Sequence, residues 1–258
     1  LHYPLRRQRQ MCIRDRFPTL TYGGRDRVDG TPTLGAYSNR YVVRERFVYR
    51  RPETLDAAAV APLMCAGITV WEPLRSAGVG PGTRFGVVGL GGLGHLAVKL
   101  GRALGADVTV FTTSPGKAKD AQTLGADRVV VALDADAMQE LHGGLDVVID
   151  TVSVEHDLTP YLRALDLDGI LFSVGYLGPV TVSTVDLLIG RKRLASAGSG
   201  GHHRTQELLD FCSEHDIVAD VEVVSSAEIA HALTRLRRND VRYRFVLDLQ
   251  SIGDPSDE

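Results

Sequence analysis

Three glycines at fixed spacing, Gly89, Gly91 and Gly94, are the residues of this chain whose chemistry is easiest to interpret. They form the pattern G-x-G-x-x-G directly after the apolar run from Arg84 to Val88. In such a pattern the first glycine permits a tight turn, the second lets the backbone approach a pyrophosphate, and the third lets the next helix pack close to the strand. The spacing predicts a dinucleotide-binding turn, with a merely structural turn as the alternative.

The segments on either side of the glycines favour the binding interpretation. Arg84 to Val88 is rich in apolar and β-branched residues, as in a strand buried on both faces. Apolar residues then recur at helical spacing up to Leu104, Gly105 ends the predicted helix, and residues 107–112 form a second strand. This order directs the positive end of the helix dipole at the phosphates of a bound dinucleotide.

The residues after the second strand indicate which dinucleotide to expect. An NAD site usually has Asp or Glu about twenty residues after the glycines, bonded to the ribose 2′-hydroxyl. Residues 112–117 contain no carboxylate but include Thr113, Ser114 and Lys117. Hydroxyls and a lysine suit a 2′-phosphate, so the sequence favours NADP over NAD. Ser114 and Pro115 also suit the start of a helix, and the two roles are compatible.

Composition and charge exclude several classes of protein. The 258 residues carry a formal net charge of −3 with mixed signs, which argues against binding to nucleic acid or to a membrane surface. No apolar run approaches the roughly twenty residues of a membrane span. The three cysteines, Cys12, Cys65 and Cys212, make no disulfide framework, which is typical of the reducing cytosol. We therefore expect a cytoplasmic protein.

The two ends of the chain differ from the rest. Residues 1–16 begin without Met, contain five arginines and have no periodic apolar face. They resemble neither a secretory signal nor a transit peptide. A nucleic-acid-binding arm is disfavoured because nothing else in the chain is basic. We interpret this leader as a foreign or mis-joined segment on a truncated chain, and residues 253–258 as a short polar tail.

After the glycine motif, α and β segments alternate as in a doubly wound sheet. The predicted strands are 128–131, 145–149, 169–174 and 194–201, and the predicted helices are 117–124, 134–141, 156–165 and 185–189. Ligands of such sheets lie at the carboxyl ends of the strands. Asp150, Thr151, Gly175 and the run from Ala197 to Gly200 are at such ends. Each alone is as easily an ordinary loop residue, but the fold rule favours them together.

The segment before the glycine motif predicts a β-rich region followed by helix. Tyr37 to Tyr49 alternates and is rich in Val, Tyr and Phe, as in a half-buried antiparallel strand. From Leu55 the chain is helical and mostly apolar, with Pro62 and Gly67 interrupting the helical period. The β-rich piece has too few strands for a core of its own, so it must pack against other elements.

The last portion, residues 221–249, predicts a strand, a helix around 227–238 and a strand at 243–249. This pattern does not continue the preceding alternation cleanly. We expect the portion to pack with residues 17–52 and to form with them a second domain that is discontinuous in sequence.

The chain resembles the zinc-dependent medium-chain alcohol dehydrogenases, in particular the cinnamyl-alcohol-dehydrogenase-like branch. The matching stretches are TLTYGG, YSNRYVVRERFV, APLMCAGITVWEPL, GVVGLGGLGHLAVKLGRALGADVTVFTTS, VIDTVSVEHDL, TQELLDFCSEHDIVADVEVV and NDVRYRFVLD. The resemblance implies an α/β fold, with a Rossmann doubly wound parallel sheet at 66–216. It also implies a remnant of a β-rich GroES-like catalytic domain at 17–65, to which the chain returns at 217–252. The implied reaction is reversible hydride transfer between NADP(H) and a small-molecule aldehyde or primary alcohol.

The resemblance also implies which residues contact the cofactor. These are Thr69, Gly89, Leu90, Gly91, Gly92, Leu93, Gly94, His95, Thr113, Ser114, Lys117, Thr151, Gly175, Ala197, Gly198 and Ser199. The run Ala197-Gly198-Ser199 departs from the family, which usually has Ser, a variable residue and Ile there. The departure bears on contacts near the nicotinamide.

A catalytic zinc in this family is held by two Cys and one His and polarises the carbonyl. Cys65 in APLMCAG matches one of these ligands, although without the family a small buried core residue would be the better interpretation. The other ligand motifs lie upstream of the resemblance, so the resemblance implies an incomplete zinc site. We interpret His95, His156, His202 and His203 as surface or loop residues.

Three functions stay open at this point. The first is an NADP-dependent zinc alcohol dehydrogenase in fragment form, the second a non-catalytic NADP-binding fragment, and the third a zinc-free reductase. A short-chain dehydrogenase is excluded, because no tyrosine is followed four residues later by lysine. We expect little or no activity from the chain as it stands. The resemblance further implies a homodimer formed through the last Rossmann strand.

Overall fold

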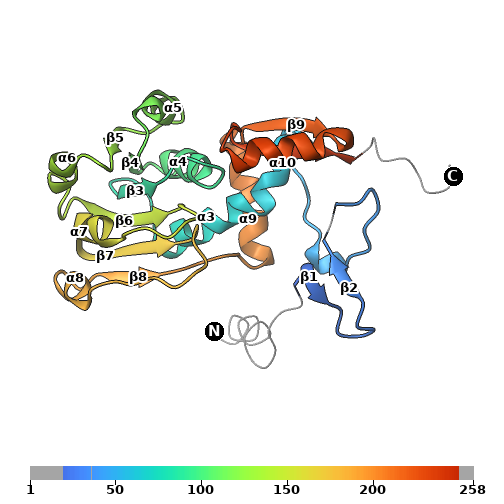
Figure 1. Cartoon of the computed structure of the whole chain (residues 1–258), viewed down its shortest axis with the longest axis horizontal. Coiled ribbons are helices and arrows are strands. Elements are labelled where there is room, and N and C mark those ends of the chain that lie inside the picture. Colours follow the sequence, from blue (N-terminus) through green and yellow to red (C-terminus); the bar gives the residue numbers. More distant parts are fainter. Residues whose placement is uncertain (1–19, 36, 250–258) are drawn as a thin grey trace. The chain divides into compact units, whose positions relative to one another are not determined.

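The computed structural model describes residues 20–35 and 37–249, and the chain divides into two compact units (Figure 1). The larger unit is Arg44–Asp248, and the smaller takes in the described residues on either side of it. In the smaller unit, β1 (Tyr22–Arg25) and β2 (Pro32–Leu34) pair as an antiparallel hairpin. The predicted leader with Cys12 and the predicted polar tail lie outside the described residues.

A six-stranded parallel sheet forms the centre of the larger unit, in the order β5-β4-β3-β6-β7-β8. The order runs outward in both directions from β3 and β6, so the sheet is doubly wound with its switch point between those two strands. This confirms the predicted α/β Rossmann fold. The strands are β3 (Arg84–Val88), β4 (Asp107–Thr112), β5 (Arg128–Val131), β6 (Leu145–Asp150), β7 (Leu165–Ser173) and β8 (Arg193–Ala195).

Helices cover both faces of this sheet (Figure 1). On one face Val87 of β3 belongs to a core with side chains of α3 (Ala66–Ser76), α4 (Gly94–Ala103) and α9 (His202–Glu214). On the other face its neighbour Val88 belongs to a core with α6 (Ala135–Gln139) and α7 (Thr159–Ala164). Successive side chains of a strand point to opposite faces, so a strand covered on both sides is apolar throughout. Two shorter helices complete this set, α5 (Ala118–Thr123) and α8 (Thr184–Leu188).

The helical stretch before the glycine motif has three parts. α2 (Ala57–Val60) begins at Asp56, whose carboxylate accepts the Ala59 N–H at 2.9 Å, and the 3₁₀ helix η2 (Ala61–Met64) follows. The helical path breaks at Cys65, so the predicted interruption at Gly67 is wrong. Gly67 lies inside α3, where a Cβ would come within 3.0 Å of Leu208 and 3.1 Å of Leu63. Its lack of a side chain permits close helix packing.

The C-terminal part of the larger unit is a strand, a helix and a strand, as predicted. β9 (Val221–Ser225) pairs in parallel with β10 (Arg244–Asp248), and the 3₁₀ helix η4 (Ser226–Glu228) and α10 (Ile229–Arg237) connect them. The contacts of this pair group it with the Rossmann sheet in the larger unit. The predicted domain boundaries, including the discontinuous second domain, stay predictions.

Three sequence-based predictions of secondary structure are wrong or too long. Residues 37–49 form no strand and contain only the 3₁₀ helix η1 (Glu45–Phe47), because no described strand pairs with them. The strand expected at 194–201 ends at Ala195, which pairs with Phe172, one residue before β7 ends. The helix expected from His156 begins only at Thr159, where Pro160 occupies its first turn.

Candidate cofactor site

The glycine turn connects β3 to α4 at the switch point of the sheet. Gly89 has a φ of +88°, a left-handed conformation that favours glycine, and it permits the tight turn. A Cβ at Gly94 would collide with the Gly89 carbonyl oxygen, whereas a Cβ at Gly91 would meet no atom within 4 Å. The first and third glycines therefore shape the turn, and the second leaves the backbone open to a ligand. Together with the amino end of α4, this cradle fits a pyrophosphate.

The ends of β6 and β7 lie directly beside this turn. The Thr151 hydroxyl donates to the Val88 carbonyl oxygen at 2.7 Å, and the Thr151 N–H donates to the same oxygen at 3.0 Å. A Cβ at Gly175 would collide with the Thr151 carbonyl group. The structure thus brings Gly89, Thr151 and Gly175 together, although they are far apart in sequence.

On the other side of the turn lie the residues predicted to hold a 2′-phosphate. Thr113 and Ser114 are exposed after β4. The Lys117 ammonium donates to the Leu90 carbonyl oxygen at 3.3 Å, so it lies against the glycine turn. Ser114 occupies the N-cap position of the 3₁₀ helix η3 (Pro115–Lys117), but its side chain makes no capping hydrogen bond. The positive charge and the hydroxyls are thus on the side of the sheet that the sequence predicted.

Thr69 and the run from Ala197 to Ser199 also meet. The Thr69 hydroxyl lies 2.8 Å from the Cys65 carbonyl oxygen and 3.1 Å from the Gly198 carbonyl oxygen, and it can donate to either. Thr69 is buried, Ala197 is half-buried, and Gly198 and Ser199 are exposed. The contact ties the start of α3 to the segment after β8.

His95 is buried, so its prediction as a surface or loop residue is wrong. Its Nδ1 donates to the Gly91 carbonyl oxygen at 3.0 Å, and its Nε2 accepts the Asp220 N–H at 3.4 Å. Its ring stacks on Tyr243 with centroids 4.7 Å apart. Burial lowers the pKa of His95 to about 4, which keeps the ring neutral. His95 therefore supports the glycine turn from inside the protein.

The other predicted surface or loop histidines lie as predicted. His202 and His203 are exposed at the start of α9. His156 lies in the loop between β6 and α7, where it is partly exposed and faces the buried carboxylate of Asp150.

Arg244 of β10 is a candidate residue that the sequence reasoning missed. Its Nε donates to the Gly92 carbonyl oxygen at 3.2 Å, and a Cβ at Gly92 would collide with the guanidinium. Burial lowers the pKa of Arg244, so this cation lies in a poorly hydrated position beside the glycine turn. The segment NDVRYRFVLD carries the arginine, but no local spacing links it to a turn about 150 residues earlier.

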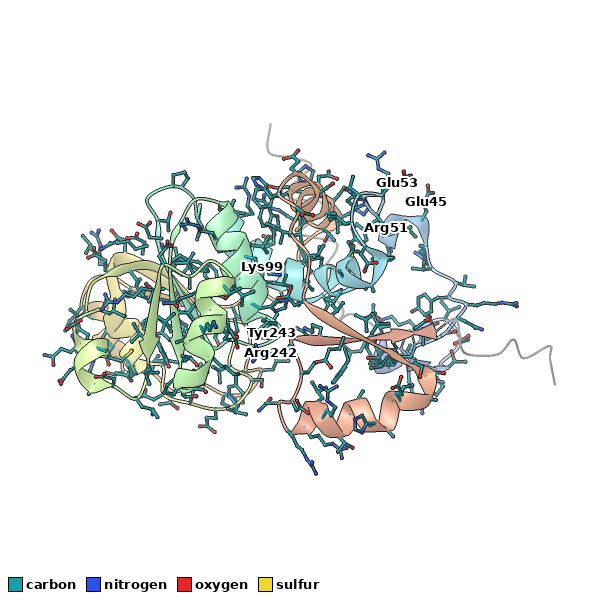
Figure 2. The ribbon with its side chains drawn as sticks, turned by 90° about the horizontal axis from the view of Figure 1, so that it is seen from above. Glu45, Arg51, Glu53, Lys99, Arg242 and Tyr243 are labelled. Carbon is teal, nitrogen blue, oxygen red and sulfur yellow. The ribbon has the colours of Figure 1, made fainter. Side chains whose placement is uncertain are left out.

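Further contacts hold the segment before β10 against α4 and α5. Figure 2 labels Lys99, Arg242 and Tyr243 in this region. Lys99 forms an ion pair with Asp220 at 2.7 Å, and the Tyr243 N–H donates to the Asp220 carbonyl oxygen at 2.9 Å. Arg242 pairs with Asp120 of α5 at 2.6 Å. These contacts fix Arg244 relative to the glycine turn.

Cys65, the predicted zinc ligand, is exposed at the start of α3. The alternative of a small buried core residue is therefore wrong for Cys65; Cys212 has that role, and burial raises the pKa of its thiol to about 12. Within residues 20–35 and 37–249, no three His, Cys, Asp or Glu side chains lie close enough to hold a metal ion. The described residues by themselves do not fit a zinc site.

Across the described part of the chain, no single helix is long and apolar enough to cross a membrane. One bent pair, Ala57–Met64 with Ala66–Ser76, meets the length and composition criteria when taken together.

Comparison with known proteins gives the family. The family model for zinc-binding dehydrogenases matches residues 92–214. A probable cinnamyl alcohol dehydrogenase 6 of Oryza sativa subsp. japonica is 47% identical over 236 residues, which cover 89% of this chain and 65% of the relative. The NADP-dependent alcohol dehydrogenase C 1 of Mycolicibacterium smegmatis is 46% identical over 233 residues, covering 90% and 66%. The chain thus spans just under two thirds of the length of these relatives.

Solved structures agree. The cinnamyl alcohol dehydrogenase SbCAD4 of Sorghum bicolor superimposes with a TM-score of 0.86 and 43% identity over 90% of this chain and 67% of that one. A Helicobacter pylori structure titled as CAD complexed with NADP(H) gives a TM-score of 0.79 and 34% identity, covering 87% and 64%. The class defined by fold and site is the medium-chain dehydrogenases with a Rossmann sheet. Within it, the chain belongs to the zinc-binding alcohol dehydrogenases, in the cinnamyl-alcohol-dehydrogenase-like branch.

Proposed function

We propose that this chain binds NADP(H) in preference to NAD(H). The observation that carries the proposal is the cradle of Gly89, Gly91 and Gly94, with the Lys117 ammonium beside it and no carboxylate among residues 112–117. A lysine favours a 2′-phosphate by charge, whereas an NAD site has an acid there. In this proposal Thr151 and Gly175 line the nicotinamide half of the cofactor site. Arg244 balances the pyrophosphate charge beside Gly92.

The test is a binding titration of NADPH and NADH on the purified chain. Lys117→Ala should weaken NADPH binding about tenfold, the size of one charge-assisted hydrogen bond, and leave NADH binding unchanged. Lys119→Ala is the matched control, since Lys119 is exposed two residues further on, at the start of α5. Equal affinity of the native chain for NADPH and NADH would refute the NADP assignment.

We further propose a reaction for full-length proteins of this type, namely reversible hydride transfer. The proposed substrates are aldehydes and primary alcohols. The bound cofactor supplies or accepts the hydride. The names of the relatives support this substrate class. The residues of this chain bind and orient the nicotinamide end, with Thr151 held against Val88 at the switch point.

Cys65 is the proposed zinc ligand of this chain, and it is one ligand of the three that a catalytic zinc takes from a protein. For that reason we expect little turnover from this chain alone. Aldehyde-dependent NADPH oxidation, measured with zinc content, tests this. A rate that survives chelation and Cys65→Ala would favour a zinc-free reductase, and NADPH binding without turnover would favour a binding fragment.

The expected homodimer and cytoplasmic location also belong to this proposal. β8 lies at the edge of the six-stranded sheet and pairs only with β7 among the described strands. Edge strands are ready to pair with another chain. The unpaired Cys65 and Cys212 suit a reducing compartment. Light scattering of the purified chain would distinguish a dimer from a monomer.

A further inference from the structure

A buried carboxylate lies directly beneath the candidate cofactor site, at the end of β6. Asp150 has no exposed surface, and its main-chain oxygen accepts the N–H groups of Val174 at 2.9 Å and Gly175 at 3.2 Å. Its side chain accepts the Val152 N–H at 3.1 Å and lies 3.3 Å from the Ser173 hydroxyl. Asp150 therefore ties together the residues on both sides of Thr151 and the end of β7.

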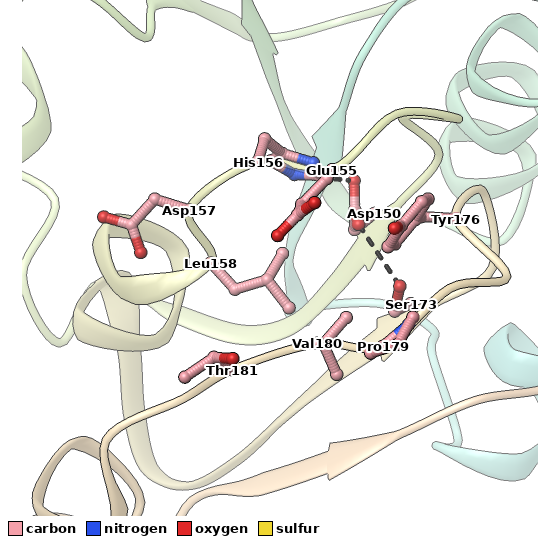
Figure 3. Close-up of a pocket in the computed structure, with 10 residues that line it drawn as sticks. All are labelled: Asp150, Glu155, His156, Asp157, Leu158, Ser173, Tyr176, Pro179, Val180 and Thr181. Atoms are coloured by element: carbon pink, nitrogen blue, oxygen red, sulfur yellow. Dashed lines mark hydrogen bonds and ion pairs between the residues drawn. The ribbon is translucent and has the colours of Figure 1, made fainter.

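The only imidazole at this carboxylate, among the described residues, belongs to His156. In Figure 3 the Asp150 carboxylate lies between the His156 ring and the Ser173 hydroxyl. His156 Nδ1 lies 2.9 Å from the Val154 carbonyl oxygen. A carbonyl can only accept, so Nδ1 carries a hydrogen. His156 Nε2 lies 3.4 Å from Asp150 Oδ1, an ion-pair distance, and is buried with no hydrogen-bond partner in the described part of the chain.

The contact between His156 and Asp150 requires a proton between the two side chains. With Nδ1 protonated, a neutral ring would point the lone pair of Nε2 at an ionised carboxylate, which is repulsive. One further proton between Nε2 and Oδ1 removes the repulsion, whether it resides on the imidazole or on the carboxyl group. Without it, the negative charge of a fully buried carboxylate would have only neutral hydrogen-bond donors, from Val152 and Ser173, which is costly. Burial has the largest influence on the Asp150 carboxyl group, and it raises the pKa of that group.

A cavity gives this pair access to solvent. It has a volume of about 330 Å³, and it lies at the carboxyl ends of β6 and β7 (Figure 3). His156 is 22% exposed through its side chain and Asp150 not at all, so proton exchange reaches the pair from the side of the ring. The other titratable side chains around the pair are Glu155 and Asp157 of the same loop, Tyr161 of α7, whose ring centroid is 6.1 Å from that of His156, and Tyr176 after β7.

We propose that His156 is a positioning residue for the cofactor, acting through a proton that it shares with Asp150. The shared proton closes the loop 151–156 onto the end of β6 and so holds Thr151 against Val88. The inference rests on the proposed function, because Thr151 matters only if a dinucleotide crosses the switch point. A cofactor whose 2′-phosphate lies at Lys117, beyond β4, has its other half over β6 and β7. His156 should therefore affect the nicotinamide half and not the adenine half.

Two probes and two variants test this on the full chain. NADPH reports the whole site, and adenosine 2′,5′-bisphosphate reports the adenine half alone. His156→Asn can still donate to Val154 but cannot reach Asp150, whereas His156→Gln can still donate to Asp150. His142→Gln is the control, since His142 is an exposed histidine between α6 and β6, away from Asp150. Melting temperatures without ligand are measured for all of them.

The expected result is a selective loss. His156→Asn should weaken NADPH binding about tenfold, the size of one hydrogen bond to a charged group, with adenosine 2′,5′-bisphosphate binding unchanged. His156→Gln, which restores a donor toward Asp150, should keep the ratio of the two affinities within about threefold of the native value.

Three outcomes would overturn the inference. The first is an unchanged affinity ratio in His156→Asn, with or without a lower melting temperature, since that would make the histidine merely structural. The second, decisive even if His156→Asn does not fold, is a His156→Gln variant that folds and still loses NADPH affinity relative to adenosine 2′,5′-bisphosphate. The third is a native chain that binds neither probe. That result would refute the proposed function itself, whereas the first two outcomes refute only the role of His156.

Discussion

The six-stranded sheet and the two-stranded sheet of β9 and β10 are both parallel, but their surroundings differ. Val148 and Ile149 at the centre of the large sheet have no exposed surface, because helices cover both faces. In the small sheet every residue of β9 is at least partly exposed, and Val223 is 55% exposed. Parallel sheets are normally buried on both faces. The small sheet thus contributes contacts to the glycine turn, while the large sheet supplies the core.

The largest expected effect tests this difference directly. Ile149→Ala should lower the free energy of unfolding by about 2–5 kcal/mol, because it leaves a cavity in a fully packed core. Val223→Ala removes less buried surface and should cost about 0.5 kcal/mol or less. Urea unfolding followed by circular dichroism measures both. Equal losses would show that the small sheet is as much a part of the core as the large one.

The junction between the two sheets should respond to pH through His95. Its pKa is held near 4 by burial, below the ordinary value of 6.5, so the folded protein resists taking up the proton that the unfolded chain accepts. Stability that is present above pH 6.5 should be lost as the pH falls toward 4, up to about 3 kcal/mol. His95→Gln lacks this titration and should lose less over the same range. An identical pH dependence of native protein and variant would contradict the assignment.

Alanine substitutions at Gly92 and Gly94 compare a contact with a side chain and a contact with the main chain. At Gly94 the new Cβ meets the Gly89 carbonyl oxygen, so Gly94→Ala should destabilise the protein by about 1–3 kcal/mol and abolish NADPH binding. At Gly92 it meets the guanidinium of Arg244 in β10, the far end of a flexible side chain. Gly92→Ala should cost less than about 1 kcal/mol and weaken NADPH binding only in part. Thermal unfolding with and without NADPH compares the two, and a reversed order would show that Arg244 is held rigidly.

The smallest effect is expected at the ion pairs of the small sheet. Hydrogen bonds from Arg235 and from the Arg242 N–H lower the pKa of Glu222, so its charge stabilises the fold above its ordinary pKa, and this is lost as the pH falls. The pair is close to solvent, and Glu222→Gln should change the melting temperature by about 2 °C or less. Glu140→Gln, at an exposed pair with Arg128 beside the large sheet, is the control. A much larger shift for Glu222 alone would mean that ion pairs, not packing, hold β9 and β10 together.

The sequence predicted the glycine turn and the strands around it because the signals are local. Gly89, Gly91 and Gly94 fall within six residues, and β3, β4 and β6 are apolar on both faces. The prediction for His95 failed for the opposite reason. The burial of His95 depends on Tyr243 and Asp220, which lie far along the chain and which no local pattern contains.

The strand predicted at 37–49 shows a further limit of local patterns. Alternation of apolar and polar residues describes a chain that could form a strand, but a strand also needs a partner for its N–H and C=O groups. The described chain offers this segment none. Arg244 was missed because its role appears only when β10 is placed beside Gly92.

By itself, the sequence determined the doubly wound α/β fold, the glycine turn and the family, since each depends on residue types at short, fixed spacing. Only the tertiary structure decided which side chains support that turn: His95 from within and Arg244 from β10. It also places His156 opposite Asp150, next to Thr151. The physical reason is that burial and hydrogen bonding are properties of neighbours in space. The strand ends that meet at the switch point come from distant parts of the chain.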